Sequence, residues 1–129
     1  MTQKDKELLL KDLCGRLPYG VICQIYDPQQ DYGEDIFDAR LIHIDAWTSH
    51  CYFWGCSETD PYKIEQAKPY LRPMSDMTEE EKIDYQAFFN YDGVEYPEEY
   101  IDWCNKNHFD YRGLIPIGLA LVAPEGMYN

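Results

Sequence analysis

The chain has 129 residues, of which 45% are hydrophobic and 16% aromatic, so it can form one domain with its own core, and these figures argue against a disordered protein. Its formal net charge of -13 argues against a broad basic surface for the phosphate backbone of nucleic acids. No run approaches the roughly 18 apolar residues of a membrane-spanning helix. The five cysteines follow no apolar leader, so we expect a cytoplasmic protein with reduced thiols.

The beginning of the chain predicts one amphipathic helix. Thr2 is a good N-cap residue, and the apolar residues after it recur at the spacing of a helix of about three turns. Gly15 and Pro18 are expected to end this helix. Its expected buried stripe consists of Leu9, Leu10, Leu13, Cys14 and Leu17.

Short strands are expected next, because β-branched and aromatic residues come in brief runs that are separated by polar turns. The first strand should place Val21, Cys23 and Ile25 together on one face. The expected strands are 20–27, 36–45, 50–54 and 63–66, and the expected turns are 28–35 and 55–62.

Two prolines mark the change from strands to helices. Pro69 and Pro73 each lack a backbone donor and restrict the residue before them, so the chain around them is expected to be extended or tightly turned. Thr78 and Glu81 then have the spacing of a capping box, with further carboxylates in the same turn. This pattern predicts a helix from Thr78 to about Asn90.

A second late helix is expected over about Pro97–Asn107, because proline suits the first helical position. Its expected buried stripe is Tyr100, Ile101, Trp103 and Cys104. The tail that follows is apolar but interrupted by glycine and proline, so we expect it to wrap along the body as turns and a short strand.

These elements predict an α+β fold in a single domain, 1–129, with a β-rich half at 1–75 and a helical half with its wrapping tail at 76–129. The expected sheet is small, antiparallel and strongly bent, or an SH3-like barrel, with three to five short strands. The N-terminal helix and the two C-terminal helices would cover its open side.

Negative charge is concentrated in the helical half. Residues 76–102 carry ten acidic side chains against one lysine, Lys82, and several tyrosines lie among them. Carboxylates beside aromatic rings would suit a partner with a basic surface, although an acidic run can also be no more than a solvated face. The predicted partner-binding surface comprises Glu79, Glu80, Asp84, Glu95, Glu98, Glu99, Asp102, Tyr85, Tyr91 and Tyr96.

An alternative is a small-ligand-binding protein or a small enzyme. Its pocket would lie between the sheet and the 97–107 helix. The residues expected to line it are His43, His50, Trp47 and Trp54.

The sequence contains few candidate metal ligands or catalytic residues. His50 and Cys51 are adjacent in an expected strand and point to opposite faces, so they cannot easily share a metal ion. Cys104 and His108 lie one helical turn apart, but a core cysteine near a helix end explains this pair better than a catalytic dyad. The common motifs of nucleotide-binding and hydrolytic enzymes are absent from the sequence. We therefore assign no catalytic residue, metal or cofactor.

Three segments carry a resemblance: KDLCGRLPYGVICQ, KPYLRPMSDMTEEEK and HFDYRGLIPIGLALVAPEGMY. They resemble a group of short proteins of gut Bacteroidales and their phages or mobile elements. The resemblance does not extend to residues 28–60 and 90–98. The group has no assigned activity, so the resemblance implies genetic context and no catalytic residues. Together with the acidic surface, it leads us to expect a non-enzymatic accessory protein that binds a protein partner, such as an inhibitor of a nucleic-acid-binding host factor.

Overall fold

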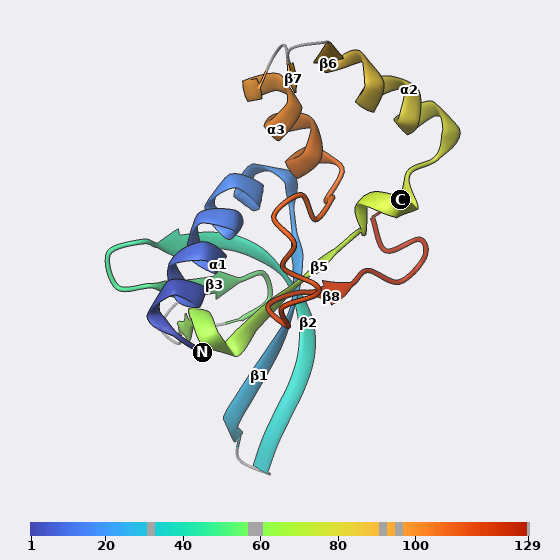
Figure 1. Cartoon of the computed structure of the whole chain (residues 1–129). Helices are drawn as coiled ribbons and strands as arrows, with labels where there is room; N and C mark the ends of the chain where they lie inside the picture. The colour runs from blue at the N-terminus through green and yellow to red at the C-terminus, as the bar shows by residue number, and fades with distance from the viewer. Residues whose placement is uncertain (31–32, 57–60, 91–92, 95–96, 129) are drawn as a thin grey trace.

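The computed structural model describes residues 1–30, 33–56, 61–90, 93–94 and 97–128. The fold is α+β, with an N-terminal helix, a six-stranded open sheet and two later helices (Figure 1). The helices are α1 (Gln3–Arg16), α2 (Glu79–Ala87) and α3 (Pro97–Lys106). The strands are β1 (Ile22–Gln30), β2 (Gly33–Asp45), β3 (His50–Phe53), β4 (Tyr62–Lys63), β5 (Ala67–Leu71), β6 (Phe89–Asn90), β7 (Gly93–Val94) and β8 (Leu121–Val122).

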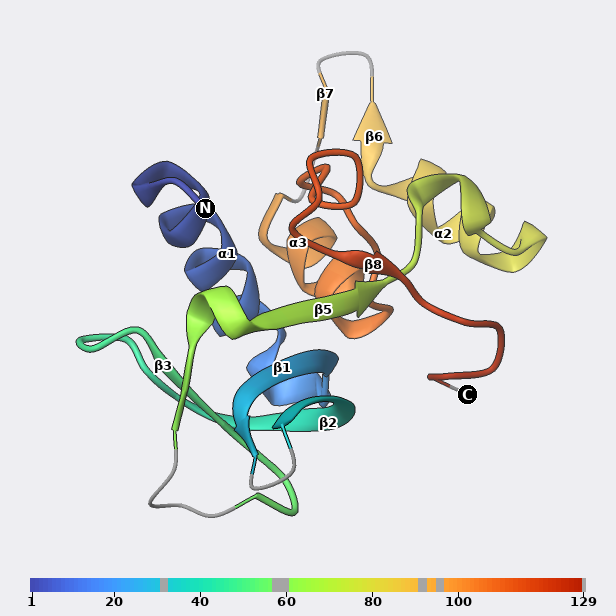
Figure 2. The same cartoon turned by 90° about the horizontal axis from the view of Figure 1, so that it is seen from below.

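The main sheet is open and mixed, so the expected barrel is wrong. Its strand order is β4-β3-β2-β1-β5-β8, and the two edge strands do not pair with each other. The sheet is also not wholly antiparallel, because β8 runs parallel to β5 with Tyr70 opposite Leu121 (Figure 2). The sequence did not show this pairing, since a two-residue strand is too short to carry a periodic pattern.

The β1–β2 hairpin is longer than expected. A turn was expected over 28–35, but β1 continues to Gln30 and β2 already begins at Gly33. This end of the hairpin extends away from the rest of the fold, at the opposite end from α2 and α3 (Figure 1). The sequence of this end is polar and lacks the apolar alternation by which a strand is recognised, so it predicted a turn.

The expected strand at 63–66 is mostly a 3₁₀ turn, Ile64–Gln66, that connects β4 to β5. Ile64 is buried, and the side chain of Gln66 accepts a hydrogen bond from the backbone N–H of Lys63 at 2.8 Å. Gln66 thus satisfies a backbone donor at the start of the turn, which a strand would have paired with a neighbouring strand.

The core lies between α1 and the inner face of the sheet. Val21, Cys23 and Ile25 alternate as predicted and are fully buried. They belong to the same apolar cluster as Leu9 and Leu13 of α1. The opposite face of the sheet is more exposed, which explains the alternation along β1.

Helix α1 begins where predicted, but its buried face differs from the expected stripe. Thr2 Oγ1 accepts from the Asp5 N–H at 3.0 Å, which forms the N-cap. Cys14 was expected inside and is exposed, whereas Asp12 and Arg16 have no exposed surface. These two charged residues can occupy the core side of the helix because they form an ion pair with each other.

Gly15 lies within α1 and does not end it. A Cβ atom at this position would lie 3.0 Å from Nδ2 of Asn105 in α3. The absence of a side chain therefore allows α3 to pack closely against α1.

The segment that leads into α2 has the expected form. β5 contains Pro69 and ends at Leu71, and a 3₁₀ turn follows after Pro73. The capping box is present, since Thr78 Oγ1 accepts from the Glu81 N–H at 3.1 Å and Glu81 accepts from the Thr78 N–H at 3.0 Å.

Among the described residues, no helix combines the length and the apolar composition that crossing a bilayer requires.

Candidate functional site

The outer face of α3 is charged and open to solvent. Glu98, Glu99 and Asp102 are exposed, whereas Trp103 is half-buried and Cys104 is buried. Among the described residues, no lysine or arginine lies within ion-pair distance of these three carboxylates. The helix dipole accounts for acids in the first turn, at Glu98 and Glu99, but not for Asp102 farther along the helix.

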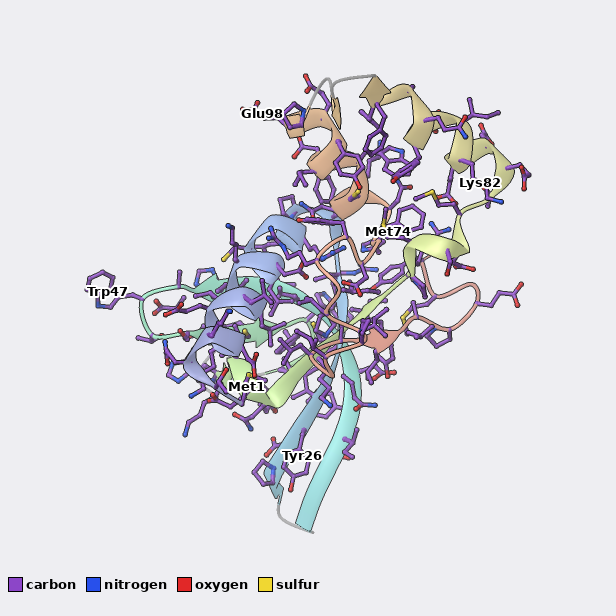
Figure 3. All side chains as sticks on the ribbon, viewed as in Figure 1. Met1, Tyr26, Trp47, Met74, Lys82 and Glu98 are labelled. Carbon is purple, nitrogen blue, oxygen red and sulfur yellow. The ribbon has the colours of Figure 1, made fainter. Side chains whose placement is uncertain are left out.

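Helix α2 also turns three of its four acids outward. Glu79, Glu80 and Asp84 are exposed, and no residue of this helix is buried. Of these three, only Glu79 has an ion-pair partner among the described residues, Lys82 Nζ at 3.0 Å. We call α2, α3 and the β6–β7 hairpin between them the acidic lobe; it forms one end of the fold (Figure 3).

Aromatic rings hold the two helices of the acidic lobe together. Tyr85 of α2 lies 6.0 Å from Tyr100 and Phe88 lies 5.8 Å from Trp103, measured between ring centroids. Trp103 in turn stacks on Phe109, with centroids 5.3 Å apart. These aromatic side chains therefore face inward in this lobe, whereas Phe89 is 37% exposed. The described carboxylates of α2 and α3 other than Glu81 face outward.

This arrangement places the residues of the predicted acidic surface in three groups. The carboxylates of Glu79, Glu80, Asp84, Glu98, Glu99 and Asp102 are exposed on the acidic lobe. Tyr85 is half-buried in the aromatic cluster, so most of its ring contacts the protein itself. Tyr91, Glu95 and Tyr96 lie outside the described residues.

The four residues of the alternative pocket do not meet in one cavity. Trp47 is 96% exposed at the turn between β2 and β3, far from α3 (Figure 3), and Trp54 is 73% exposed. His43 is exposed and packs against Tyr52, with ring centroids 5.2 Å apart. His50 alone of the four lines a groove, which has a volume of about 400 Å³ and lies between this turn and α1.

Arg72 joins the acidic lobe to the body of the protein. Its guanidinium donates to both carboxylate oxygens of Glu81, at 2.7 and 2.8 Å, and to the carbonyls of Asp76 and Asn107. The same group lies over the ring of Phe109, 4.3 Å from its centroid. The hydrogen bonds from Arg72 lower the pKa of Glu81 to about 2, so this carboxylate stays ionised.

A polar groove of about 790 Å³ lies beneath the start of α2. Three segments line it: the chain that leads into α2 with the first turn of that helix (residues 72–81), the end of α3 (residues 106–108) and the tail (residues 122–128). It is separate from the pocket expected at the histidines and tryptophans of the first half.

The residue that ends α3 in this groove is unusual. The Phe109 N–H donates to the Cys104 carbonyl and the His108 N–H donates to the Asn105 carbonyl, which is the hydrogen-bond pattern of a Schellman motif. In this motif His108 occupies the position that glycine normally takes, with φ of 62°. A side chain with a Cβ atom is strained there by roughly 1–2 kcal/mol.

The side chain of His108 is buried and neutral. It is 7% exposed, and no group among the described residues hydrogen-bonds either ring nitrogen. Burial lowers its pKa to about 4, and the charges of Arg16 and Arg72 act in the same direction.

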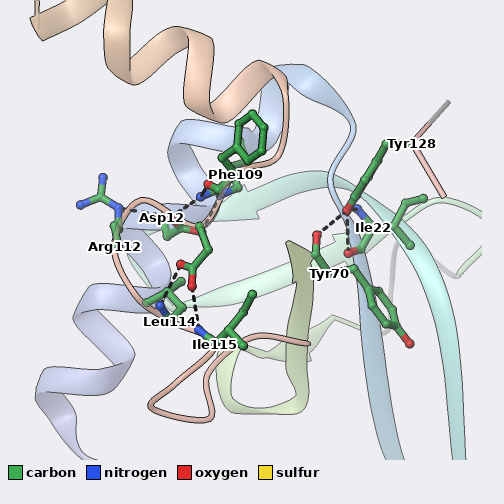
Figure 4. Close-up of polar contacts among 10 residues, drawn as sticks. Asp12, Ile22, Tyr70, Phe109, Arg112, Leu114, Ile115 and Tyr128 are labelled. Atoms are coloured by element: carbon green, nitrogen blue, oxygen red, sulfur yellow. Dashed lines mark hydrogen bonds and ion pairs between the residues drawn. The ribbon is translucent and has the colours of Figure 1, made fainter. Parts of the chain in front are cut away.

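Tyr128 forms a rigid wall of the groove. Its hydroxyl donates to the Tyr70 carbonyl at 2.7 Å and accepts from the Ile22 N–H at 3.0 Å (Figure 4). Its ring stacks on that of His108. The tail is thereby fixed to β1 and β5, and the groove has a defined shape.

Cys104 is not placed to act as a nucleophile with His108. Burial raises the pKa of the Cys104 thiol, which keeps it protonated. Helix α3 ends at Lys106, so His108 does not continue the helical spacing on which that pairing depended. Among the described residues, no three or more His, Cys, Asp or Glu side chains are arranged to hold a metal ion.

A buried charge network, which the sequence reading missed, supports the end of α3. Asp12 accepts from Arg16 Nε at 2.7 Å and from Arg112 Nε at 3.2 Å, and Arg16 donates to the Phe109 carbonyl at 2.7 Å (Figure 4). The carboxylate of Asp110 accepts from two backbone N–H groups farther along the tail, at 2.8 and 2.9 Å. The i,i+4 spacing of Asp12 and Arg16 was a visible signal, although it also fits an exposed pair.

Comparisons with known proteins add no relative: no family model, curated protein or solved structure matches the chain.

Proposed function

We propose that this protein is a non-enzymatic accessory protein that binds a protein partner with a basic surface through the acidic lobe. The observation that carries the proposal is the outer face of α3, where Glu98, Glu99 and Asp102 are exposed and no described cation pairs with them. Unpaired carboxylates close together repel one another, and a basic partner would relieve this repulsion.

The inward packing of the aromatic side chains also favours this function. Because the lobe is held by rings such as Tyr100 and Trp103, its outer face has no part in holding the two helices together. Substitutions of the outer carboxylates should therefore change binding with little effect on folding.

A nucleic-acid-binding factor of the host is the kind of partner that fits best. A cleft that binds a phosphate backbone is lined by lysine and arginine, and an acidic surface competes for the same side chains. The resemblance to short proteins of phages and mobile elements favours such an inhibitory role, since an accessory protein of this origin acts in the presence of host nucleases and defence factors.

Affinity capture from a host extract tests the proposal with two triple variants of equal charge change. The test variant carries Glu98→Gln, Glu99→Gln and Asp102→Asn on the outer face of α3. The control carries Glu7→Gln, Asp35→Asn and Glu65→Gln, three exposed acids outside the lobe. We expect the wild type and the control to retain a basic partner at low salt that the test variant loses. Equal capture by all three proteins would refute the proposal.

A further inference from the structure

The groove beneath α2 has the dimensions and chemistry of a binding site for part of a ligand. Its volume of about 790 Å³ lies within the ~300–1,000 Å³ range of ligand pockets. It adjoins the acidic lobe, because Glu80 belongs to α2 and also lines the groove. The acidic surface of α2 therefore continues to the groove.

The groove carries an excess of negative charge. Glu80 and Glu125 are exposed on its rim, and neither has a cation partner among the described residues. Asp76 is held loosely, with Oδ2 3.6 Å from Nε of Arg72. Lys106 is the one ammonium in the lining.

Arg72 offsets only part of this charge. Its guanidinium already donates to Glu81 and to two backbone carbonyls, so its donors are directed into the protein. The net effect of the lining is negative, and a positively charged group is the ligand that it favours.

His108 gives the second, independent indication of a ligand. Its imidazole is more than nine-tenths buried, lines the groove and has no hydrogen-bond partner among the described residues. Nδ1 of this ring is enclosed and lacks a partner among these residues, which is rare for a buried polar atom, so the hydrogen bonding of the ring at this wall of the groove is incomplete. Because the ring is neutral, it does not itself repel a cation.

We infer that the groove receives an arginine side chain of the partner protein. This inference rests on the proposed function, since it names the group that a basic partner inserts. The carboxylates come from two different segments, α2 and the tail, and the fork of a guanidinium can donate to acceptors on several sides at once. Pro73, Val122 and Pro124 supply apolar surface for the aliphatic part of that side chain.

The probe for the experiment is capped arginine, N-acetyl-arginine amide, with N-acetyl-citrulline amide as its uncharged counterpart of similar shape. The ring signals of His108 and Tyr128 are followed by NMR during titration of the full-length protein. We expect the arginine compound to shift both sets of signals to saturation and the citrulline compound to leave them nearly unchanged. Equal shifts with both compounds, or none with either, would overturn the inference.

Two single variants locate the binding. Glu125→Gln removes a groove carboxylate and should weaken arginine binding about threefold to tenfold, as expected for the loss of a partly exposed charge contact. Glu65→Gln changes the charge equally outside the groove and should leave the affinity unchanged. Equal weakening by both variants would show that only net charge matters, which contradicts a built site.

The two proposals can fail separately. The triple variant of the α3 outer face should still bind the arginine probe, because none of its three residues lines the groove. If that variant loses the partner while the probe fails to bind the wild type, the groove inference is wrong and the docking lobe stands. If the probe binds but all variants capture the same proteins, the proposed function is wrong.

Discussion

The imidazole of His108 lies face to face with the phenol ring of Tyr128, with ring centroids 3.6 Å apart and an interplanar angle of 12°. This contact joins the end of α3 to the tail at a position where glycine would relieve the backbone. Histidine at this position therefore brings a strained backbone and a buried polar ring together at the groove.

The strain at this position predicts that the glycine variant is more stable than the alanine variant, the reverse of the usual order in helices. Replacing His108 by alanine or glycine removes the same stacked ring, but only alanine keeps a Cβ atom at a φ of 62°. We expect His108→Ala to be less stable than His108→Gly by about 1 kcal/mol, in contrast to ordinary helical positions. Urea unfolding of both variants measures the difference, and equal stabilities would show that the backbone there is not strained.

The stability of the fold should decrease in mild acid because His108 is protonated more easily in the unfolded chain. The pKa of His108 is lowered from 6.5 to about 4, so the unfolded chain binds a proton between these values that the folded protein does not. The contribution of His108 to stability is complete above about pH 6.5 and decreases by about 2 kcal/mol by pH 5. His108→Asn, which tolerates the left-handed conformation, should remove this part of the pH dependence in urea unfolding. If the free energy of unfolding depends on pH equally in the wild type and the variant, groups other than His108 cause the loss of stability in acid.

The buried ion pair of α1 predicts a strong effect from a single substitution. Asp12→Asn leaves the guanidinium of Arg16 without its charge partner in the interior, which we expect to destabilise the fold by about 3–5 kcal/mol. Replacing both residues by apolar ones, Asp12→Leu with Arg16→Met, should recover most of that loss. The free energies of unfolding give the comparison, and a double variant no more stable than Asp12→Asn would mean that the charges themselves are needed.

The clamp between Arg72 and Glu81 should control how firmly α2 is held. Glu81→Gln weakens the charged hydrogen bonds to Arg72, and we expect the opening free energy of α2 to fall by about 1–3 kcal/mol. Hydrogen exchange of the α2 amides measures this value. Glu80→Gln makes the same charge change one residue earlier and serves as the control, with an expected effect within about 0.5 kcal/mol. Similar exchange in the two variants would contradict the role of the clamp.

The sequence predicted those elements that local chemistry determines. The caps at Thr2 and Thr78, the alternation of Val21, Cys23 and Ile25, and the break at the prolines all depend on residues that are close in the chain. The mixed form of the sheet depends on the pairing of β8 with β5, about 50 residues apart, which no local pattern records.

The candidate site was only partly visible for the same reason. The exposed acids of α2 and α3 follow from helical spacing, so their outward direction could be read from the sequence. The groove could not, because it is assembled from three distant segments. Pairing of Asp12 with Arg16 made two charged residues part of the core, which a hydrophobic pattern does not reveal.

The association rate of the captured partner, measured as a function of salt, tests the central claim most directly. If the acidic lobe steers and docks a basic surface, the rate for the wild type should fall steeply as salt rises. The triple variant Glu98→Gln, Glu99→Gln and Asp102→Asn should associate more slowly at low salt and show a shallower dependence, while the control with Glu7, Asp35 and Glu65 neutralised should resemble the wild type. Rates that do not depend on salt, or that are equal in the test and control variants, would contradict the docking role of the lobe.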